Sequence, residues 1–542
     1  MRAGLRSIAV VVSVVLLGCA ARSGAQSAPA AGTPQVRQLA YLKASNAEAG
    51  DHFGNGGTLF GDSVTISADG NTVAIGSPNE SSAARGINGN QNDNTLYSAG
   101  AVYVFTRNGN NWAQQAYVKA SNPTMSAEFG HAVVLSADGN TMAVSAYFEP
   151  SATKGINGKQ DDESIPQAGA IYVFTRAGTR WSQQAFIKAS NTGEAGVGDA
   201  FGDGDQFGFS LAISDDGSTI AVGSNSEDSS ATGINGNQDD NSMISAGAVY
   251  VFTRTGNNWT QQAYVKPSNT FGGMQFGYAV ALSADGSTMG VAGYDEGGAT
   301  REINGPQARG RTGSGAAYIF TRAGSTWTQQ AYLKASNAEQ NDSLGVSIAL
   351  SDDGSTALVG SLDEDCLATG VNPTDPTCIN DFMSDTSTGA AYVFVRNGTA
   401  WTQQAFIKPS NTGENDIFAS RLALSGDGNL FVASSQLEDG NGKGLNGNQK
   451  DDSATDAGAV YLFTRSGSTW TQQASIKASN NEAFDEFGSA MALSRDGRVL
   501  VVGSRGEDSA VKTINGNQND NSADEAGAAY VFGISVAAAG SR

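Results

Sequence analysis

Histidine is almost missing from this chain of 542 residues, which contains only His52 and His131. This scarcity argues against most histidine-based acid–base catalysis and against histidine-rich metal sites. A mechanism that uses only aspartate and glutamate is still open.

Positive charge is also scarce, because 32 lysines and arginines face 53 aspartates and glutamates, for a formal net charge of −21. A surface this acidic repels phosphate backbones, so we expect no nucleic-acid partner. It would attract divalent cations or basic partners. Charged residues make up only 16% of the chain, but apolar segments recur along its whole length, which argues against general disorder.

Long apolar runs are lacking as well, and no segment is long enough to span a membrane as a helix. Residues 8–17 form a short apolar run after Arg2 and Arg6, which predicts a secretory signal. The run ends in Leu-Leu-Gly-Cys, which resembles the lipobox of bacterial lipoproteins, with Cys19 as the lipidated residue. The alternative is an ordinary signal peptide cut near Ala20 or later.

Both alternatives predict an extracytoplasmic protein of the bacterial cell envelope or surface, which meets the membrane only through a lipid anchor. Residues 1–19 are the predicted signal, and residues 20–34, rich in Ala, Gly, Ser and Pro, read as a flexible tether.

Cysteine is rare, and two of the three cysteines, Cys366 and Cys378, lie twelve residues apart in one polar loop. In an oxidising compartment we expect them to form a disulfide, worth about 3 kcal/mol in the chain-entropy model. Metal binding by the two thiols is the alternative.

What the chain has in abundance is repetition. The phrase Ala-Gly-Ala-Val-Tyr-Val-Phe of residues 99–105 contains a glycine that recurs every 68 to 78 residues. Its seven positions are Gly100, Gly169, Gly247, Gly315, Gly389, Gly458 and Gly527. The phrase Trp-x-Gln-Gln-Ala, which contains all six tryptophans, and a Ser-x-Asp-Gly phrase recur in step with it. A fixed period of this kind predicts a repeat architecture.

Each unit predicts four strands. In the first unit these are residues 63–67, residues 72–76 after an Asp-Gly turn, the apolar residues 101–105, and residues 112–120 after an Asn-Gly turn. Seven units over residues 35–533 predict an all-β, seven-bladed β-propeller of four-stranded antiparallel blades, followed by a tail at residues 534–542.

The two ends of the repeat array complement each other. The last unit lacks a fourth strand, and residues 36–46 end in a sequence that matches residues 115–122. We therefore predict that the N-terminal strand completes the last blade and closes a monomeric ring, which removes open sheet edges.

These units resemble the FG-GAP repeats of integrin alpha-subunit propellers and their bacterial relatives. The Phe-Gly elements are Phe60-Gly61, Phe129-Gly130, Phe207-Gly208, Phe276-Gly277 and Phe487-Gly488, with Leu344-Gly345 and Phe418-Ala419 as departures. The resemblance implies the fold and no particular activity. Family members often bind calcium between strands one and two, but this loop is too short here for that site.

The long loops, which join strand two to strand three and one blade to the next, should share one face and form the natural binding surface. They contain a recurrent glutamate and an Asn/Asp-rich motif. The glutamates are Glu80, Glu149, Glu227, Glu296, Glu364, Glu438 and Glu507, and the motif is Asn90, Asn92 and Asp93, repeated around Asp162, Asp240, Asp451 and Asp520.

Three roles of these side chains are open, one of which is to form a ring that contacts a cationic ligand directly. They can accept hydrogen bonds from loop amides and lock the turns, or they can gather oxygen ligands around Ca²⁺ in up to five similar sites. A lysine also recurs in each unit, either as a solvated base or as a partner for the acidic loops.

We expect a non-enzymatic binding or adhesion protein that recognises a protein or glycan on the long-loop face. The alternatives are a scaffold of the cell envelope and, third, a carboxylate-based lyase or hydrolase. Blades four and five depart most from the repeat, so a specific site is expected near Arg301, Arg309, Arg311 and the loop from Cys366 to Cys378.

Overall fold

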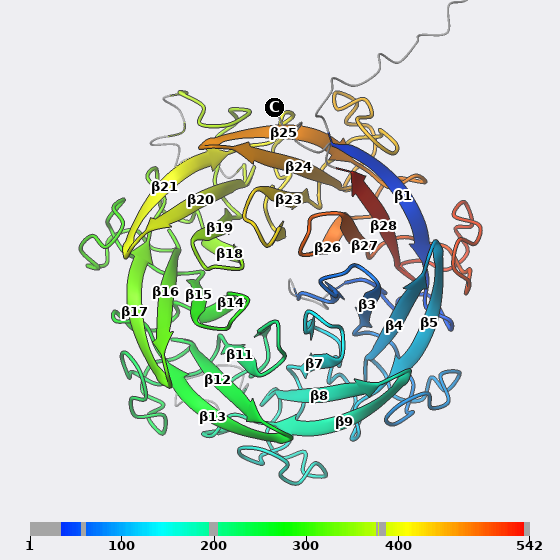
Figure 1. Ribbon diagram of the computed structural model, residues 1–542, viewed down its shortest axis with the longest axis horizontal. Helices are drawn as coiled ribbons and strands as arrows, with labels where there is room; N and C mark the ends of the chain where they lie inside the picture. Colours follow the sequence, from blue (N-terminus) through cyan, green and yellow to red (C-terminus); the bar gives the residue numbers. More distant parts are fainter. Residues whose placement is uncertain (1–33, 56–60, 194–203, 376–377, 379–385, 536–542) are drawn as a thin grey trace, which may run out of the picture.

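The computed structural model describes residues 34–55, 61–193, 204–375, 378 and 386–535, and it confirms the predicted fold class. Within these residues, twenty-eight strands form seven four-stranded antiparallel sheets, arranged as blades around a central axis (Figure 1). In each blade the first strand lies nearest the axis and the fourth lies at the circumference. Among the described residues, no helix is long and apolar enough to cross a membrane.

The strands of the first four blades have the following bounds. Blade one contains β2 (Val64–Ile66), β3 (Thr72–Ser77), β4 (Ala101–Asn108) and β5 (Asn111–Val118); blade two contains β6 (Val133–Leu135), β7 (Thr141–Ala146), β8 (Ala170–Ala177) and β9 (Arg180–Ile187). Blade three contains β10 (Ser210–Ile213), β11 (Thr219–Ser224), β12 (Ala248–Thr255) and β13 (Asn258–Val265); blade four contains β14 (Phe276–Leu282), β15 (Thr288–Gly293), β16 (Ala316–Ala323) and β17 (Thr326–Leu333).

The other three blades follow the same plan. Blade five contains β18 (Leu344–Leu350), β19 (Thr356–Ser361), β20 (Ala390–Asn397) and β21 (Ala400–Ile407); blade six contains β22 (Leu422–Leu424), β23 (Leu430–Ser435), β24 (Ala459–Ser466) and β25 (Thr469–Ile476). Blade seven contains β26 (Phe487–Leu493), β27 (Val499–Ser504) and β28 (Ala528–Ser535), completed by β1 (Gln35–Leu42).

The N-terminal strand closes the ring as predicted. β1 pairs antiparallel with β28, from Gln35 opposite Ser535 to Leu42 opposite Ala529. Because β28 continues to Ser535, the last blade extends two residues beyond the predicted boundary at 533. The two ends of the described chain are thus held in one sheet.

The Phe-Gly elements sit where neighbouring blades meet, and in blade one the predicted pair was wrong. Phe53 takes this place, with its ring 5.4 Å from that of Tyr103, as Phe129 lies 5.3 Å from Tyr172 in the next blade. Phe60 lies outside the described residues. The repeated glycine is needed for this contact, because Gly100 has a φ of +80° and a Cβ there would lie 2.1 Å from the Phe129 carbonyl oxygen.

The two sets of long loops lie on one face, as predicted. The loop that leaves blade one donates backbone hydrogen bonds to the β3–β4 loop, from Ser126 to the carbonyl of Tyr97 (2.9 Å) and from Glu128 to that of Ser98 (3.1 Å). Equivalent bonds join Gln206 to Gln167 and Ile417 to Ser387 at other junctions.

The short turns surround the central axis at the end of the ring opposite the long-loop face. In each Ser-x-Asp-Gly turn the aspartate accepts hydrogen bonds from its own turn, as Asp69 does from the Ser67 hydroxyl (2.6 Å) and the Asn71 amide (3.0 Å). Successive turns are linked by backbone hydrogen bonds of 2.8 to 3.0 Å, in which the amide of one residue donates to the carbonyl of the next residue in this series: Ala68, Ala137, Asp215, Ala284, Asp352, Gly426 and Arg495.

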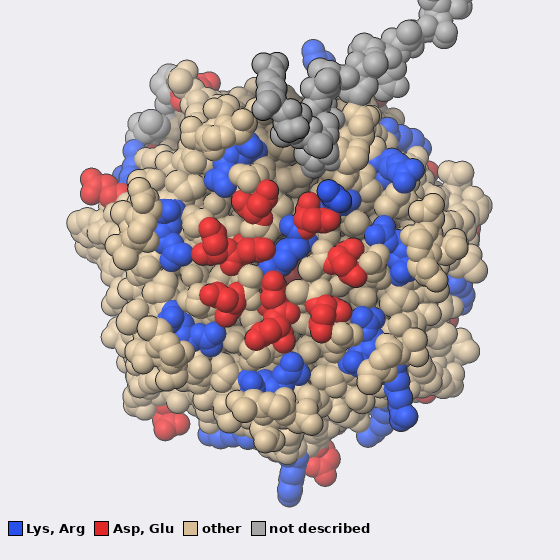
Figure 2. Space-filling model, viewed as in Figure 1, with Lys and Arg blue, Asp and Glu red and all other residues tan. Residues whose placement is uncertain are grey.

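Charges at this end are arranged in circles. Figure 2 shows carboxylates gathered around the axis, with arginines and lysines in a wider circle. The guanidinium of Arg495 pairs with both Asp215 and Asp352 across the axis.

In five blades a tryptophan joins the outer strand to the preceding blade. Trp259 donates from Nε1 to the Gln184 side chain of the preceding blade at 2.9 Å, and the Arg254 guanidinium stacks on its ring. The second glutamine of the Trp-x-Gln-Gln-Ala phrase reaches its neighbour because a β-bulge occurs at that residue in each outer strand. In β1 this position is Leu39, and the Nε1 of Trp112 has no hydrogen-bond partner in the described part of the chain.

The seam between blades seven and one should therefore be improvable. Leu39→Gln supplies the missing acceptor, so we expect the free energy of unfolding to rise by about 1 kcal/mol. The matched change Gln184→Leu removes the acceptor of Trp259 and should lower it by about 1 to 3 kcal/mol. Denaturant titrations measure both, and a loss of stability in Leu39→Gln would contradict this account of the seam.

Candidate functional site

Each blade junction on the long-loop face is built on a buried lysine–glutamate pair. The recurrent glutamate follows strand two, and its partner is the lysine just after the fourth strand of the same blade. Six pairs have Nζ–Oε distances of 2.6 to 3.1 Å: Lys43–Glu507, Lys119–Glu80, Lys188–Glu149, Lys266–Glu227, Lys334–Glu296 and Lys408–Glu364. Lys477 and Glu438 form the seventh. The lysines are therefore partners of the acidic loops, one of the two predicted roles.

The same glutamate binds the preceding blade. An asparagine after the preceding outer strand donates from Nδ2 to the carboxylate in all seven blades, as Asn46 does to Glu80 at 3.2 Å. The Oδ1 of Asn46 accepts the hydroxyl of Tyr103 at 2.5 Å, and Tyr117 donates to Glu80 at 2.8 Å. Each junction is thus a network of charged and polar groups with little exposure.

The glutamates also hold their own loops. The amide of Ser82 donates to Glu80 at 3.2 Å, and the amides of Ser151, Ser229 and Ser509 donate to their own glutamates at the same distance. This geometry agrees with the interpretation that the glutamates lock the turns by accepting hydrogen bonds from loop amides. Burial lowers the pKa of Lys188, and the charge of Glu149 offsets part of this effect.

The Asn/Asp-rich motif lies farther out and stabilises local turns. Asn90 accepts the amide of Asn92 at 3.2 Å, and Asp93 accepts the amide of Thr95 at 3.0 Å. The equivalent aspartates accept hydrogen bonds from nearby serines: Asp162 from Ser164, Asp240 from Ser230 and Ser242, and Asp451 from Ser453. Asp520 is partly exposed in the same motif.

Within the described residues, no group of three or more His, Cys, Asp or Glu side chains is placed to hold a metal ion. The structure thus brings each glutamate to a lysine and leaves the aspartates of the motif on separate turns. Calcium binding by these loops stays a prediction.

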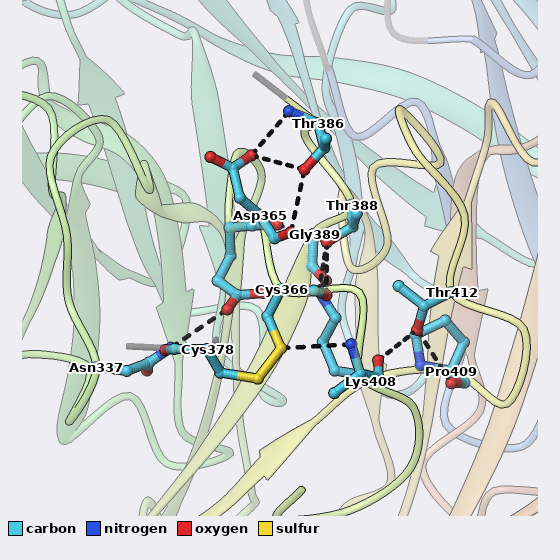
Figure 3. The surroundings of a disulfide bond; sticks show 12 residues. Asn337, Asp365, Cys366, Cys378, Thr386, Thr388, Gly389, Lys408, Pro409 and Thr412 are labelled. Atoms are coloured by element: carbon cyan, nitrogen blue, oxygen red, sulfur yellow. Dashed lines mark hydrogen bonds and ion pairs between the residues drawn. A yellow bond between two sulfur atoms is a disulfide. The ribbon is translucent and has the colours of Figure 1, made fainter. Parts of the chain in front are cut away.

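Cys366 and Cys378 form the predicted disulfide (Figure 3). Cys366 stands two residues after Glu364, where blade one has Ser82, whose hydroxyl donates to the Asn90 carbonyl at 2.9 Å. The carbonyl of Cys378 accepts Asn337 at 3.2 Å, just as the carbonyl of the motif glutamine does in other blades. The disulfide therefore takes over, covalently, a loop contact made elsewhere by a hydrogen bond.

The arginines of blade four are engaged within their own surroundings. Arg301 pairs with Glu339, Arg309 lies over the Phe271 ring at 4.4 Å, and Arg311 donates to the Ala299 carbonyl. His131 is buried against Tyr147, with ring centroids 4.0 Å apart, and His52 contacts Glu525 at 2.8 Å. These side chains brace the loops.

Polar clefts open between the loop that enters a blade and the long loop of that blade. At blade two the cleft has a volume of about 300 Å³ and is lined by residues that include Asn122, Gln160 and Glu163. The equivalent cleft at blade six has a volume of about 550 Å³ and extends inward to Glu438 and Asp439. The departures from the repeat had pointed to blades four and five, and this cleft lies in blade six, where no specific site was predicted.

The FG-GAP repeat family matches residues 327–394 and 470–532, which cover parts of blades four, five, six and seven. Together with the sevenfold repetition and the closed ring of blades, this match decides the family. The protein is an FG-GAP repeat β-propeller.

Other comparisons are distant. The hydrazine synthase of Kuenenia stuttgartiensis is 12% identical, with 82% of this chain and 93% of that chain covered and a TM-score of 0.43. The periplasmic gluconolactonase PpgL of Pseudomonas aeruginosa is 13% identical, with 77% and 86% covered and a TM-score of 0.41. No curated protein matches the chain. At this level of likeness, the activities in these names do not transfer to the FG-GAP propeller.

Breaking one junction should destabilise the whole ring. Lys266→Met leaves the buried Glu227 carboxylate without its cation, and we expect a loss of about 3 to 5 kcal/mol in the free energy of unfolding. The control Arg498→Met removes an exposed partner of Asp496 and should change stability by less than about 1 kcal/mol. Equal, small effects in denaturant titrations would show that the buried pair does not hold the junction.

Thermal unfolding separates turn locking from calcium binding. Because each recurrent glutamate already has a lysine partner, we expect the same unfolding midpoint in millimolar calcium and in chelator. A ligand that binds only the folded state raises the midpoint. A rise of several degrees in calcium would overturn this expectation and place calcium in the Asn/Asp-rich loops.

Proposed function

We propose that this FG-GAP propeller is a non-enzymatic recognition protein that binds a ligand on its long-loop face, outside the cytoplasm. The observation that carries the proposal is the pair of polar clefts at equivalent junctions of blades two and six, each set between two long loops. Loops on a rigid framework are the usual place for binding residues.

The state of the repeated carboxylates favours binding over catalysis. The junction glutamates are paired with lysines, and the aspartates of the short turns accept hydrogen bonds within those turns. On the axis, Asp215 and Asp352 share Arg495. Catalytic carboxylates must exchange protons with a substrate, and groups held this way are poorly suited to that task.

We also propose that the ring is displayed at the surface of the cell envelope on a lipidated Cys19. Cys19 lies outside the described residues, and the support is the sequence pattern around it. Because β1 follows the tether directly, the anchor would join the ring at the blade that closes it.

Oriented immobilisation tests the proposal. The mature protein is attached to beads through Arg180→Cys, at an exposed short turn, or through Asn92→Cys, in an exposed long loop. We expect glycans from an array, or proteins from an envelope extract, to bind the Arg180→Cys beads and to bind the Asn92→Cys beads less well. Equal capture in both orientations, or turnover of a bound compound, would contradict the proposal.

A further inference from the structure

Blade six departs from the other blades at one position of its outer strand. The residue that follows Gln-Gln-Ala is Ser475, which pairs with Tyr461 in the sheet, as Tyr117 pairs with Tyr103 in blade one. In the other six blades this residue is aromatic: Tyr41, Tyr117, Phe186, Tyr264, Tyr332 and Phe406.

The missing ring removes one contact of the junction glutamate that lines the cleft. The hydroxyl of the equivalent tyrosine contacts the junction glutamate at 2.6 to 3.0 Å where a tyrosine is present. A serine cannot fill this space, and the cleft of blade six reaches the junction glutamate Glu438. At blade two, where Phe186 keeps the aromatic ring, the smaller cleft is not lined by Glu149.

The contact between a tyrosine and the junction asparagine is looser beside this cleft than in the other blades. In six blades a tyrosine hydroxyl donates to the asparagine of the junction at 2.5 to 2.9 Å. In blade six the hydroxyl of the fully buried Tyr461 and the Oδ1 of Asn411 still interact, but they fall outside the distance and angle of a hydrogen bond. Asn411 lines the cleft, so an occupant can contact this side chain.

The charge of the cleft selects a cation. Its lining contains five carboxylates, Glu414, Asp416, Glu438, Asp439 and Asp452, and one cationic residue, Lys450. Burial, together with the neighbouring charge of Glu438, raises the pKa of Asp416 to about 7. An ammonium group in the cleft would favour the ionised form of this side chain.

The remaining lining selects a polyhydroxylated ligand. It consists of Asn411, Thr412, Gly413, Asn415 and Gln449, and no lining residue has an aromatic or aliphatic side chain. Protein partners usually anchor in pockets through large apolar or aromatic side chains, for which this cleft offers no matching surface. A second hollow of about 480 Å³ shares Gln449 and Lys450 with the cleft and offers room for a chain of sugar units.

We propose that the cleft of blade six binds an amino sugar with a free amine, within a longer oligosaccharide. This rests on the proposed function and names its ligand class. The ammonium pairs with the carboxylates around Asp416 and Asp452, and the sugar hydroxyls bind Asn411, Asn415 and Gln449.

Calorimetric titration of the mature protein with glucosamine oligosaccharides tests this proposal. We expect wild type to bind them and to bind the fully N-acetylated oligosaccharides at least about tenfold more weakly, because acetylation removes the charge. Equal binding of the two, or no binding of the free amine, would overturn the assignment.

Ser475→Tyr restores the residue type of the other blades, and we expect it to fold normally and to lose binding by at least about tenfold. Phe186→Tyr, the same kind of change in blade two, is the control and should bind like wild type. Unchanged binding by Ser475→Tyr would exclude this cleft.

Asp452→Asn changes an exposed carboxylate of the cleft and does not touch the junction, so it tests the charge even if Ser475→Tyr fails to fold. We expect weaker binding, and unchanged binding would contradict the proposal.

If glucosamine oligosaccharides do not bind but the oriented beads still capture another ligand, only the ligand class is wrong. If neither assay shows binding, the proposed function fails as well.

Discussion

The ring depends on a buried lysine–glutamate pair that is repeated at every blade junction. Burying two charges costs desolvation free energy, and such pairs persist only when hydrogen bonds complete their coordination. Here an asparagine from the preceding blade and a loop amide share the Glu80 carboxylate with Lys119. The pair therefore fixes three things together: the end of the outer strand, the start of the long loop, and the position of the neighbouring blade.

The same junction explains how one blade can gain a binding site without loss of the ring. In blade six the ion pair between Lys477 and Glu438 and the contact from Asn411 are kept, whereas the aromatic ring is replaced by Ser475. The junction still joins the blades, and the cleft beside it reaches Glu438. A repeat protein can thus vary one residue outside the essential network and leave its neighbours unchanged.

Much of this structure could be predicted because repetition reveals what a single copy hides. Strand order, ring closure by residues 36–46 and the common face of the long loops followed from the spacing of three phrases. The lysine–glutamate pairs were harder to foresee, since Lys119 and Glu80 are separated by 39 residues and meet only through the strand register. Phe53 was missed because Phe60-Gly61 offered a second match to the same pattern.

Blade six was overlooked for a different reason. Attention went to the loops that lost their motif, in blades four and five, where Arg301, Arg309 and the disulfide turned out to brace the loops. The informative change was a single residue in a strand that otherwise keeps its phrase, Trp470 to Ala474 followed by Ser475. The importance of that change is clear only once the structure shows that the tyrosine hydroxyl of other blades contacts the junction glutamate.

The central claim is that seven equivalent junctions, including the one made by the N-terminal strand, hold a single closed ring. Native-state hydrogen exchange of the mature protein tests it most directly, by comparing amides of β1 with those of the other outer strands. The account predicts that Leu42, beside Lys43, is protected as strongly as Val118, beside Lys119. Exchange of the β1 amides that is orders of magnitude faster than in β5 would mean that the ring opens at blade seven, and would contradict the claim.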